Sequence, residues 1–290
     1  MSTTTVTHPI ASGIRGAETV IGFGRKWRTV NATQKLFLER YLEPCSDDFF
    51  RIREIETVAS SNHGEINKFL KKKGFTVRLE QLKRKEFGVA SVLDLLVEWL
   101  APGTKVPITL AGAEKKYPGV RLKKGVDFYR SVNHDAPFAL IETQSGDTVG
   151  MTAYDGDTAD FALVEKAEAI AGRKQSMNDF DALYFPMVDL NQEIDISWLK
   201  GMSAVSASGE DVMISQARQQ TKFRMSESGA RTQSAAAVGI RMLPAHASKP
   251  NLVINKPFLV WVTRPGLYKP LFVGHVTPED WKAPKGLEVP

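Results

Sequence analysis

The chain has 290 residues, a formal net charge of +5, and a composition of 42% hydrophobic and 24% charged residues. These values are typical of an ordinary globular protein with a sizeable core, in one large domain or two small ones. Basic clusters at residues 71–73, 83–85 and 123–124 lack interleaved aromatic side chains. They therefore indicate a solvated surface, and we do not expect nucleic acid as a partner.

The single cysteine, Cys45, excludes an internal disulfide framework. Its acidic neighbours Asp47 and Asp48 would raise the pKa of the thiol, which argues against a reactive nucleophile. Residues 1–17 lack the layout of a signal peptide, and no apolar run approaches the roughly 18 residues of a membrane helix. We expect no membrane segment and a non-secreted, cytoplasmic protein, with a virion as an alternative location.

The first hundred residues read mainly as helices. Residues 1–7 are polar and predict a frayed tail. Asn31 is a candidate N-cap of a helix that ends before Pro44, and Gly74 is a candidate C-terminal glycine of another. The predicted helices cover residues 31–43, 46–58, 65–73 and 87–100, with a short strand at residues 75–79.

After Pro102 the patterns become those of strands. A hairpin is predicted at residues 137–154, because two apolar runs flank a turn that contains Gly146. Further strands are predicted at residues 180–190, 221–226, 252–262 and 271–276, while residues 161–170 fit a strand or a helix. Helices first and strands later, without a repeating strand–helix unit, predict an α+β fold in one domain, with a helix-rich part (residues 1–103) and a sheet-rich part (residues 104–290).

Catalytic and metal-binding patterns are weak. None of the five histidines stands in a recognisable hydrolase or zinc motif, so we expect no enzyme, no catalytic residue and no metal or cofactor. The sequence around His134 fits a turn better than a metal site, and residues 155–157 fit a loop because the closing glutamate of a calcium loop is missing.

Residues 230–242 are the most unusual stretch. Every second residue from Ala230 to Met242 is small or apolar, which is a strand pattern, although the small side chains have weak β-propensity. The alanine run at residues 235–237 leaves a short helix over residues 226–241 as an alternative. The two-residue alternation favours a segment that can be either a strand or a loop.

Four pieces around this stretch resemble the serpin family. Glu227-x-Gly229 before a small-residue run is similar to the hinge of a serpin reactive-centre loop. Residues 255–260 and 271–276 look like the strands that follow the loop, with His275 where an arginine is more usual. Residues 183–187 and 199–202 are similar to the pieces that precede the hinge. The resemblance covers roughly the last hundred residues.

The resemblance implies a protease inhibitor whose loop, residues 227–250, is cleaved and then inserts into a sheet. It implies a hinge that begins at Glu227 and Gly229. It also implies that the alternate side chains that become buried on insertion must fit beneath the sheet without a charge; these are Ala230, Thr232, Ser234 and Ala236. It also implies a scissile bond in a window that contains Arg241, Met242, Leu243 and His246. The implied partner is a serine or cysteine protease. The alternative is a non-inhibitory structural or protein-binding module, viral or intracellular, and the short chain favours it.

Overall fold

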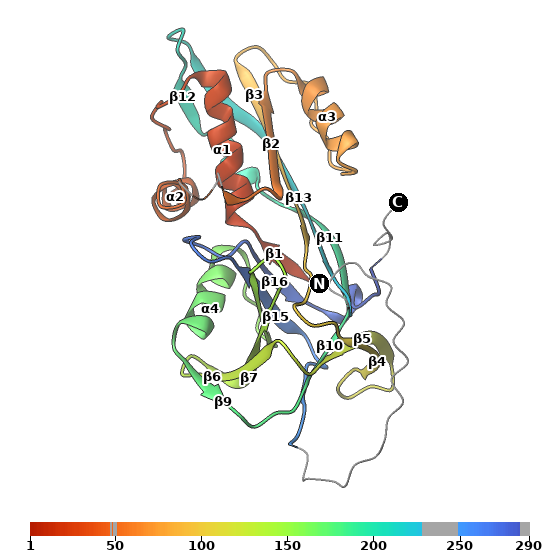
Figure 1. Cartoon of the computed structure of the whole chain (residues 1–290). Helices are drawn as coiled ribbons and strands as arrows, with labels where there is room; N and C mark the ends of the chain where they lie inside the picture. Colours follow the sequence, from red (N-terminus) through yellow and green to blue (C-terminus); the bar gives the residue numbers. More distant parts are fainter. Residues whose placement is uncertain (47, 49–50, 228–248, 285–290) are drawn as a thin grey trace.

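The structure is a computed structural model that describes residues 1–46, 48, 51–227 and 249–284. It contains three β-sheets (Figure 1). Buried side chains from all three sheets form one large hydrophobic core. α1 and α3 lie on opposite faces of the central sheet, and α4 packs against the seven-stranded sheet. Within the described residues no helix is long and apolar enough to cross a membrane.

The central sheet has the strand order β11-β13-β3-β2, with β12 paired to β13 outside this path. Its neighbouring strands are antiparallel, except that β13 and β3 are parallel over the register Met213–Glu86 to Arg224–Leu96. The strands are β2 (Ile55–Ser60), β3 (Glu86–Leu96), β11 (Val188–Ile194), β12 (Ser203–Val205) and β13 (Asp211–Met225).

The predicted helix over residues 87–100 is wrong, because this segment forms β3. One face of β3 packs on α1, where the Cβ of a side chain at Gly13 would lie 2.8 Å from Val89. The other face carries Ala90 and Val92, which pack with Ile66 of α3. A strand buried on both faces is apolar at nearly every position, so it loses the alternation that distinguishes a strand from a buried helix.

The other two sheets contain most of the C-terminal strands. The seven-stranded sheet has the order β1-β16-β15-β8-β7-β6-β9, and the four-stranded sheet has the order β14-β10-β5-β4. The strands are β1 (Thr3–Thr5), β4 (Thr104–Thr109), β5 (Lys116–Leu122), β6 (Val126–Ser131), β7 (His134–Glu142), β8 (Thr148–Ala153), β9 (Lys174–Met177), β10 (Leu183–Pro186), β14 (Leu252–Val253), β15 (Phe258–Thr263) and β16 (Phe272–Val276).

The helices agree only in part with the sequence patterns. Asn31 accepts a hydrogen bond from the Gln34 N–H and so caps α2, and Gly74 has a positive φ of 72° after α3, as predicted. Residues 161–170 are helical. The helices are α1 (Thr7–Ile21), α2 (Ala32–Phe37) continued by a π-helix (Leu38–Leu42), α3 (His63–Lys72), α4 (Asp160–Gly172) and two 3₁₀ turns (Ser197–Leu199 and Pro278–Asp280).

Four further predictions are wrong. Residues 1–7 are not frayed, because Thr3–Thr5 pair with β16 and the chain then enters α1. In the predicted helix over residues 46–58, residues 55–58 belong to β2. Residues 75–79 form no strand; they are held by the Gln220 side chain, which accepts from the Thr76 N–H. Residues 180–190 are two strands, β10 and β11, in different sheets. Pro186 ends the first of them, where it interrupts the ladder.

The core joins the central sheet to the seven-stranded sheet. The Phe223 ring of β13 stacks on the Phe272 ring of β16, with 4.3 Å between centroids and an interplanar angle of 14°. Phe185 and Leu122 of the four-stranded sheet belong to the same cluster. The three sheets are therefore held at one junction by aromatic and aliphatic contacts.

The packing inside the seven-stranded sheet gives a first prediction. A Cβ at Gly150 would lie 2.0 Å from the Trp261 ring, whereas a Cβ at Gly172 would meet no atom within 4 Å. We expect Gly150→Ala to destabilise the fold by about 1–3 kcal/mol through overpacking, and Gly172→Ala to be near neutral or slightly stabilising. Thermal unfolding of both variants checks this, and an equal melting temperature for the two would contradict the packing.

Candidate functional site

The candidate site lies where the parallel pair of the central sheet ends. The register of β3 and β13 finishes at Leu96 and Arg224, so both strands end at the same edge. β13 leads directly into the predicted hinge at Glu227. The two strands are hydrogen-bonded to each other, so no other strand lies between them. A segment that turned back from β13 would run antiparallel to both.

Two hydrogen bonds to backbone carbonyls hold the exit of β13. The Trp99 indole Nε1–H donates to the Ser226 carbonyl at 2.7 Å, and the Gly103 N–H donates to the Glu227 carbonyl at 2.7 Å. Trp99 is buried and meets the Phe185 ring edge-on, at 5.7 Å between centroids and 83° between planes. Both donors belong to the connection between β3 and β4, so this connection fixes the last residues before the hinge.

The Glu227 carboxylate adds an ion pair with Lys105 at 3.0 Å. The Lys105 side chain is 73% exposed, so water and salt screen the pair, and it is worth at most about 1 kcal/mol. The Trp99 bond is buried, and its loss would cost the hydrogen bond together with indole packing. We therefore rank the Trp99 contact above the ion pair in holding the exit.

Polar groups lie beneath the junction of β3 and β13. A chain of hydroxyl groups joins α1 to the sheet, because Ser12 contacts Thr57 at 2.9 Å and Thr57 contacts Ser91 at 3.1 Å between oxygens. On the neighbouring β13, Gln219 and Thr221 are buried, and their Oε1 and Oγ1 atoms have no hydrogen-bond partner. Buried polar atoms without partners carry a free-energy cost of about 1–3 kcal/mol each.

The far end of the segment is fixed in a different sheet. The Asp181 N–H donates to the Pro250 carbonyl at 3.0 Å, and β14 then pairs in parallel with β10. Lys249 forms a hydrogen bond to Asn178 at 2.7 Å. Residues 226–250 thus connect the central sheet with the four-stranded sheet.

Most of the predicted site residues lie outside the described part of the chain. Glu227 is described and lies at the exit of β13. The others fall in residues 228–248, which the structure does not describe: Gly229, Ala230, Thr232, Ser234, Ala236, Arg241, Met242, Leu243 and His246. Sequence reasoning missed Trp99, Gly103 and Lys105. The sequence predicts that a regular element ends at residues 101–103, but no local pattern predicts the contact of this connection with residues 226–227.

The histidines and the cysteine form no catalytic arrangement within the described residues. Burial lowers the pKa values of His8, His134 and His275. Burial and the neighbouring Asp48 carboxylate raise the pKa of the Cys45 thiol to about 12, so it is not a nucleophile, as the sequence predicted. Residues 155–157 are a loop in which Asp155 pairs with Lys256 at 2.7 Å.

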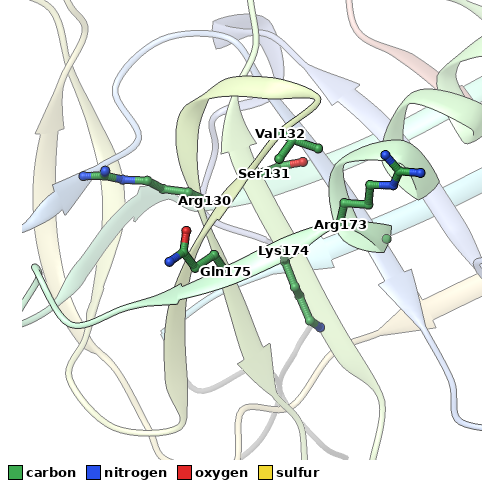
Figure 2. A pocket seen from close by; sticks show the side chains of 7 residues that line it. Arg130, Ser131, Val132, Arg173, Lys174 and Gln175 are labelled. Atoms are coloured by element: carbon green, nitrogen blue, oxygen red, sulfur yellow. The ribbon is translucent and has the colours of Figure 1, made fainter.

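A shallow pocket at the edge of the seven-stranded sheet is lined by Arg130, Arg173 and Lys174, among others (Figure 2). Its cationic groups point in different directions in Figure 2. Arg130 pairs with Asp179, and the Lys174 ammonium lies over the Tyr129 ring. The pocket therefore offers no convergent set of charges for one ligand.

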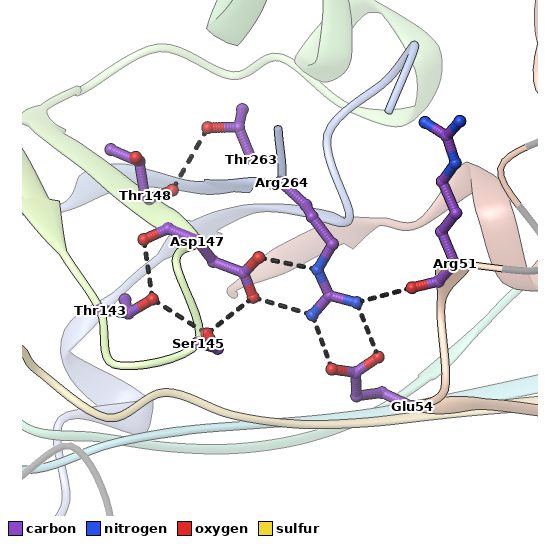
Figure 3. Close-up of polar contacts among 8 residues, drawn as sticks. All are labelled: Arg51, Glu54, Thr143, Ser145, Asp147, Thr148, Thr263 and Arg264. Atoms are coloured by element: carbon purple, nitrogen blue, oxygen red, sulfur yellow. Dashed lines mark hydrogen bonds and ion pairs between the residues drawn. The ribbon is translucent and has the colours of Figure 1, made fainter. Parts of the chain in front are cut away.

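An ion-pair network ties the base of β2 to the seven-stranded sheet (Figure 3). The Arg264 guanidinium donates to both oxygens of Asp147, at 2.7 and 2.8 Å, and to both oxygens of Glu54, at 2.6 and 3.1 Å. It also donates to the Arg51 carbonyl at 3.1 Å. Burial is the largest single effect and would raise the pKa of Glu54, but the hydrogen bonds and charge of Arg264, together with backbone hydrogen bonds, outweigh it and lower the pKa.

Comparison with known proteins finds one family model that matches part of the chain and solved structures that share its fold. Residues 190–278 match the family model described as Serpin (serine protease inhibitor). The structure of Serpin48, described as a highly specific serpin in the insect Tenebrio molitor, aligns with a TM-score of 0.55 and 12% identity over 93% of this chain and 96% of that chain. Mouse protein-Z dependent protease inhibitor aligns with a TM-score of 0.49 and 14% identity, over 93% of this chain and 78% of its own. No curated protein matches the sequence. The α+β fold and the family resemblance expected from the sequence are confirmed.

The ranking of the exit contacts is testable. We expect Trp99→Phe to lower the free energy of unfolding by about 1–2 kcal/mol, because it removes the bond to the Ser226 carbonyl and part of the ring. Lys105→Ala should lower it by less than about 1 kcal/mol, and this small effect should vanish at high salt. Urea unfolding at low and high salt compares the two. A larger loss for Lys105→Ala would reverse the ranking.

The network predicts a pH dependence. Because its folded-state pKa lies below the ordinary value of 4.5, Glu54 contributes stability that is present above pH 4.5 and is lost as the pH falls through the lowered folded pKa. Arg264→Met removes the largest cause of this lowering, so the melting temperature of the variant should fall less than that of the wild type between pH 5 and pH 3.

Arg51→Met is the matched control, because among the described residues the Arg51 side chain donates only to the Gly266 carbonyl, at 2.9 Å, and its backbone carbonyl is kept. It should retain the acid dependence of the wild type. If Arg264→Met also retained it in full, the contribution of Glu54 would be refuted.

Proposed function

We propose that this chain, a serpin by its fold and by the sequence match over residues 190–278, inhibits a serine or cysteine protease. The protease cleaves within residues 227–250, and the part that remains attached to β13 inserts between β3 and β13. The inserted strand carries the acyl-enzyme with it and distorts it. The proposal rests on one observation, the parallel pairing of β3 and β13 at the exit of the segment.

The topology supports insertion because it supplies a place for an antiparallel strand. Insertion breaks one parallel ladder and forms two antiparallel ladders, so the sheet gains hydrogen bonds overall. Roughly a dozen additional bonds at about 1 kcal/mol net, with side-chain burial, amount to about 10 kcal/mol. This is comparable to the whole stability of a typical domain, so the form with the segment outside the sheet would be metastable.

The environment of the junction supports the alternating pattern from Ala230 to Ala236. One face of an inserted strand would lie over α1, which approaches the sheet closely at Gly13 and Gly16. Small side chains fit there, whereas a buried charge would have no partner. The hydroxyl groups of Thr232 and Ser234 could donate to the unpartnered buried oxygens of Gln219 and Thr221. Arg231 and Gln233 would face away from α1.

The side chains in the scissile window indicate which classes of protease would cleave it. Arg241 suits a trypsin-like enzyme, and Leu243 suits a chymotrypsin- or subtilisin-like one, although Pro244 disfavours cleavage directly after Leu243. Met242 and His246 complete the window. The test is incubation with a panel of serine and cysteine proteases, followed by a search for a complex that survives boiling in detergent. Clean turnover of the chain with no complex for any protease would favour the non-inhibitory binding module.

Cleavage should change the stability if insertion occurs. We expect a single cut in residues 241–247 to raise the melting temperature by about 20–40 °C, because about 10 kcal/mol is released and each kcal/mol shifts the melting point by about 2–4 °C. The cut is mapped by mass spectrometry and the melting followed by circular dichroism. An unchanged melting temperature after complete cleavage would rule out insertion.

Two neighbouring substitutions test the register. Thr232→Arg should turn the inhibitor into a substrate, because insertion would bury an unpaired charge. Arg231→Ala should leave inhibition intact, because this side chain would face away from α1. The ratio of complex to cleaved product on a denaturing gel reports the outcome. Equal damage from both changes would show that the inserted register is different.

A further inference from the structure

A buried cluster of three potential metal ligands lies apart from the β3–β13 junction. It contains His8, Cys45 and Asp48, and one ligand atom of each lies within 4.8 Å of the others. All three residues are at most 5% exposed. Nitrogen, sulfur and carboxylate oxygen are the ligand atoms that zinc takes in proteins.

The cluster and the Tyr268 N–H that is bonded to it bring together three distant parts of the chain. His8 lies in the first turn of α1, and Cys45 and Asp48 lie between the π-helix and β2. The Asp48 carboxylate is 3.0 Å from His8 Nε2, and it accepts a hydrogen bond from the Tyr268 N–H at 3.0 Å. Tyr268 belongs to the connection between β15 and β16. A hydrogen bond of this kind orients a carboxylate, as the outer partners of metal ligands do.

Protein groups alone do not give both ring nitrogens of His8 a suitable hydrogen-bond partner in either neutral protonation state. A proton on Nε2 suits Asp48, but Nδ1 is then a buried acceptor with no hydrogen-bond partner. A proton on Nδ1 leaves the Nε2 lone pair facing the carboxylate, which is repulsive. A doubly protonated ring is disfavoured by full burial. A cation at Nε2 resolves the conflict, because it binds Nε2 and the carboxylate together while Nδ1 keeps its proton, which faces the Pro270 carbonyl.

We propose that His8 Nε2, Cys45 Sγ and Asp48 hold a zinc-class divalent cation. Binding replaces the S–H bond by a metal–sulfur bond and releases that proton to solvent, and the ring proton resides on Nδ1. The site is then electrically neutral, since one dication meets one thiolate, one carboxylate and one neutral imidazole, and a neutral site tolerates burial. A fourth position remains for water.

The cation would tie α1 to the segment before β2 and, through Tyr268, to the β15–β16 connection. Because α1 packs against β3 at Gly13, its N-terminal anchor also supports the central sheet. Metal binding to the folded state alone stabilises it in proportion to the logarithm of the free metal concentration. At about a thousandfold excess over the dissociation constant, the melting temperature should rise by roughly 10 °C.

The single cysteine makes the test specific. The reduced full chain, freed of metal by a chelator, is titrated with Co²⁺ and then with Zn²⁺. We expect one equivalent of Co²⁺ to give a thiolate-to-cobalt charge-transfer band that Zn²⁺ abolishes, because Cys45 is the only thiol in the sequence. Failure of the wild type to give this band, or cobalt binding without it, would overturn the proposal.

Variants confirm the ligand set. Cys45→Ser should abolish the band, and Asp48→Asn and His8→Gln should each weaken Co²⁺ binding at least tenfold. His63→Gln, in the first turn of α3, is the control and should leave the titration unchanged. Circular dichroism identifies any variant that fails to fold, and the wild-type titration decides the question in that case. A wild-type melting temperature that Zn²⁺ leaves unchanged would also overturn the proposal.

Discussion

The structure depends on one parallel strand pair that is buried on both faces. β3 and β13 lie in the middle of the central sheet, between α1 on one face and α3 with residues 75–79 on the other. All other neighbours in this sheet are antiparallel. The pair is therefore the one place in the described sheet where an added strand would run antiparallel to both neighbours. The contacts at the exit of β13 lie at the end of this pair, and Gly13 of α1 faces β3 within it.

The two halves of the pair are anchored differently. β13 is fixed to the seven-stranded sheet by the stacked rings of Phe223 and Phe272 and to β11 along its C-terminal half. β3 is joined to β2, whose first residues are held through Glu54 by Arg264. Both anchors lie near the C-terminal ends of β3 and β13, where residues 227–250 leave the sheet. They therefore stabilise the end of the strand pair at which an inserted strand would enter.

The sequence predicted some of the later strands and missed most of the central sheet, while residues 180–190 and 252–262, each predicted as one strand, form two strands in different sheets. The hairpin of β7 and β8 alternates and has a glycine turn, so its local signals sufficed. β3 is apolar on both faces and was mistaken for a helix, and Thr3–Thr5 were mistaken for a tail because their partner β16 lies at the other end of the chain. The exit contacts were not predictable either, since Trp99 and Ser226 are 127 residues apart and neither has a distinctive local pattern. The hinge pattern was visible because its period is local.

The interface between α1 and the central sheet determines how the sheet could widen. Two glycines of α1 face the sheet, and hydroxyl groups of Ser12, Thr57 and Ser91 fill part of the contact. Hydroxyl groups rotate and can re-form hydrogen bonds with a neighbour after a small displacement, whereas interlocked branched side chains cannot. β2 and β3 could therefore shear sideways across α1 while remaining in contact with it, so that widening the sheet would not require the helix to leave its surface.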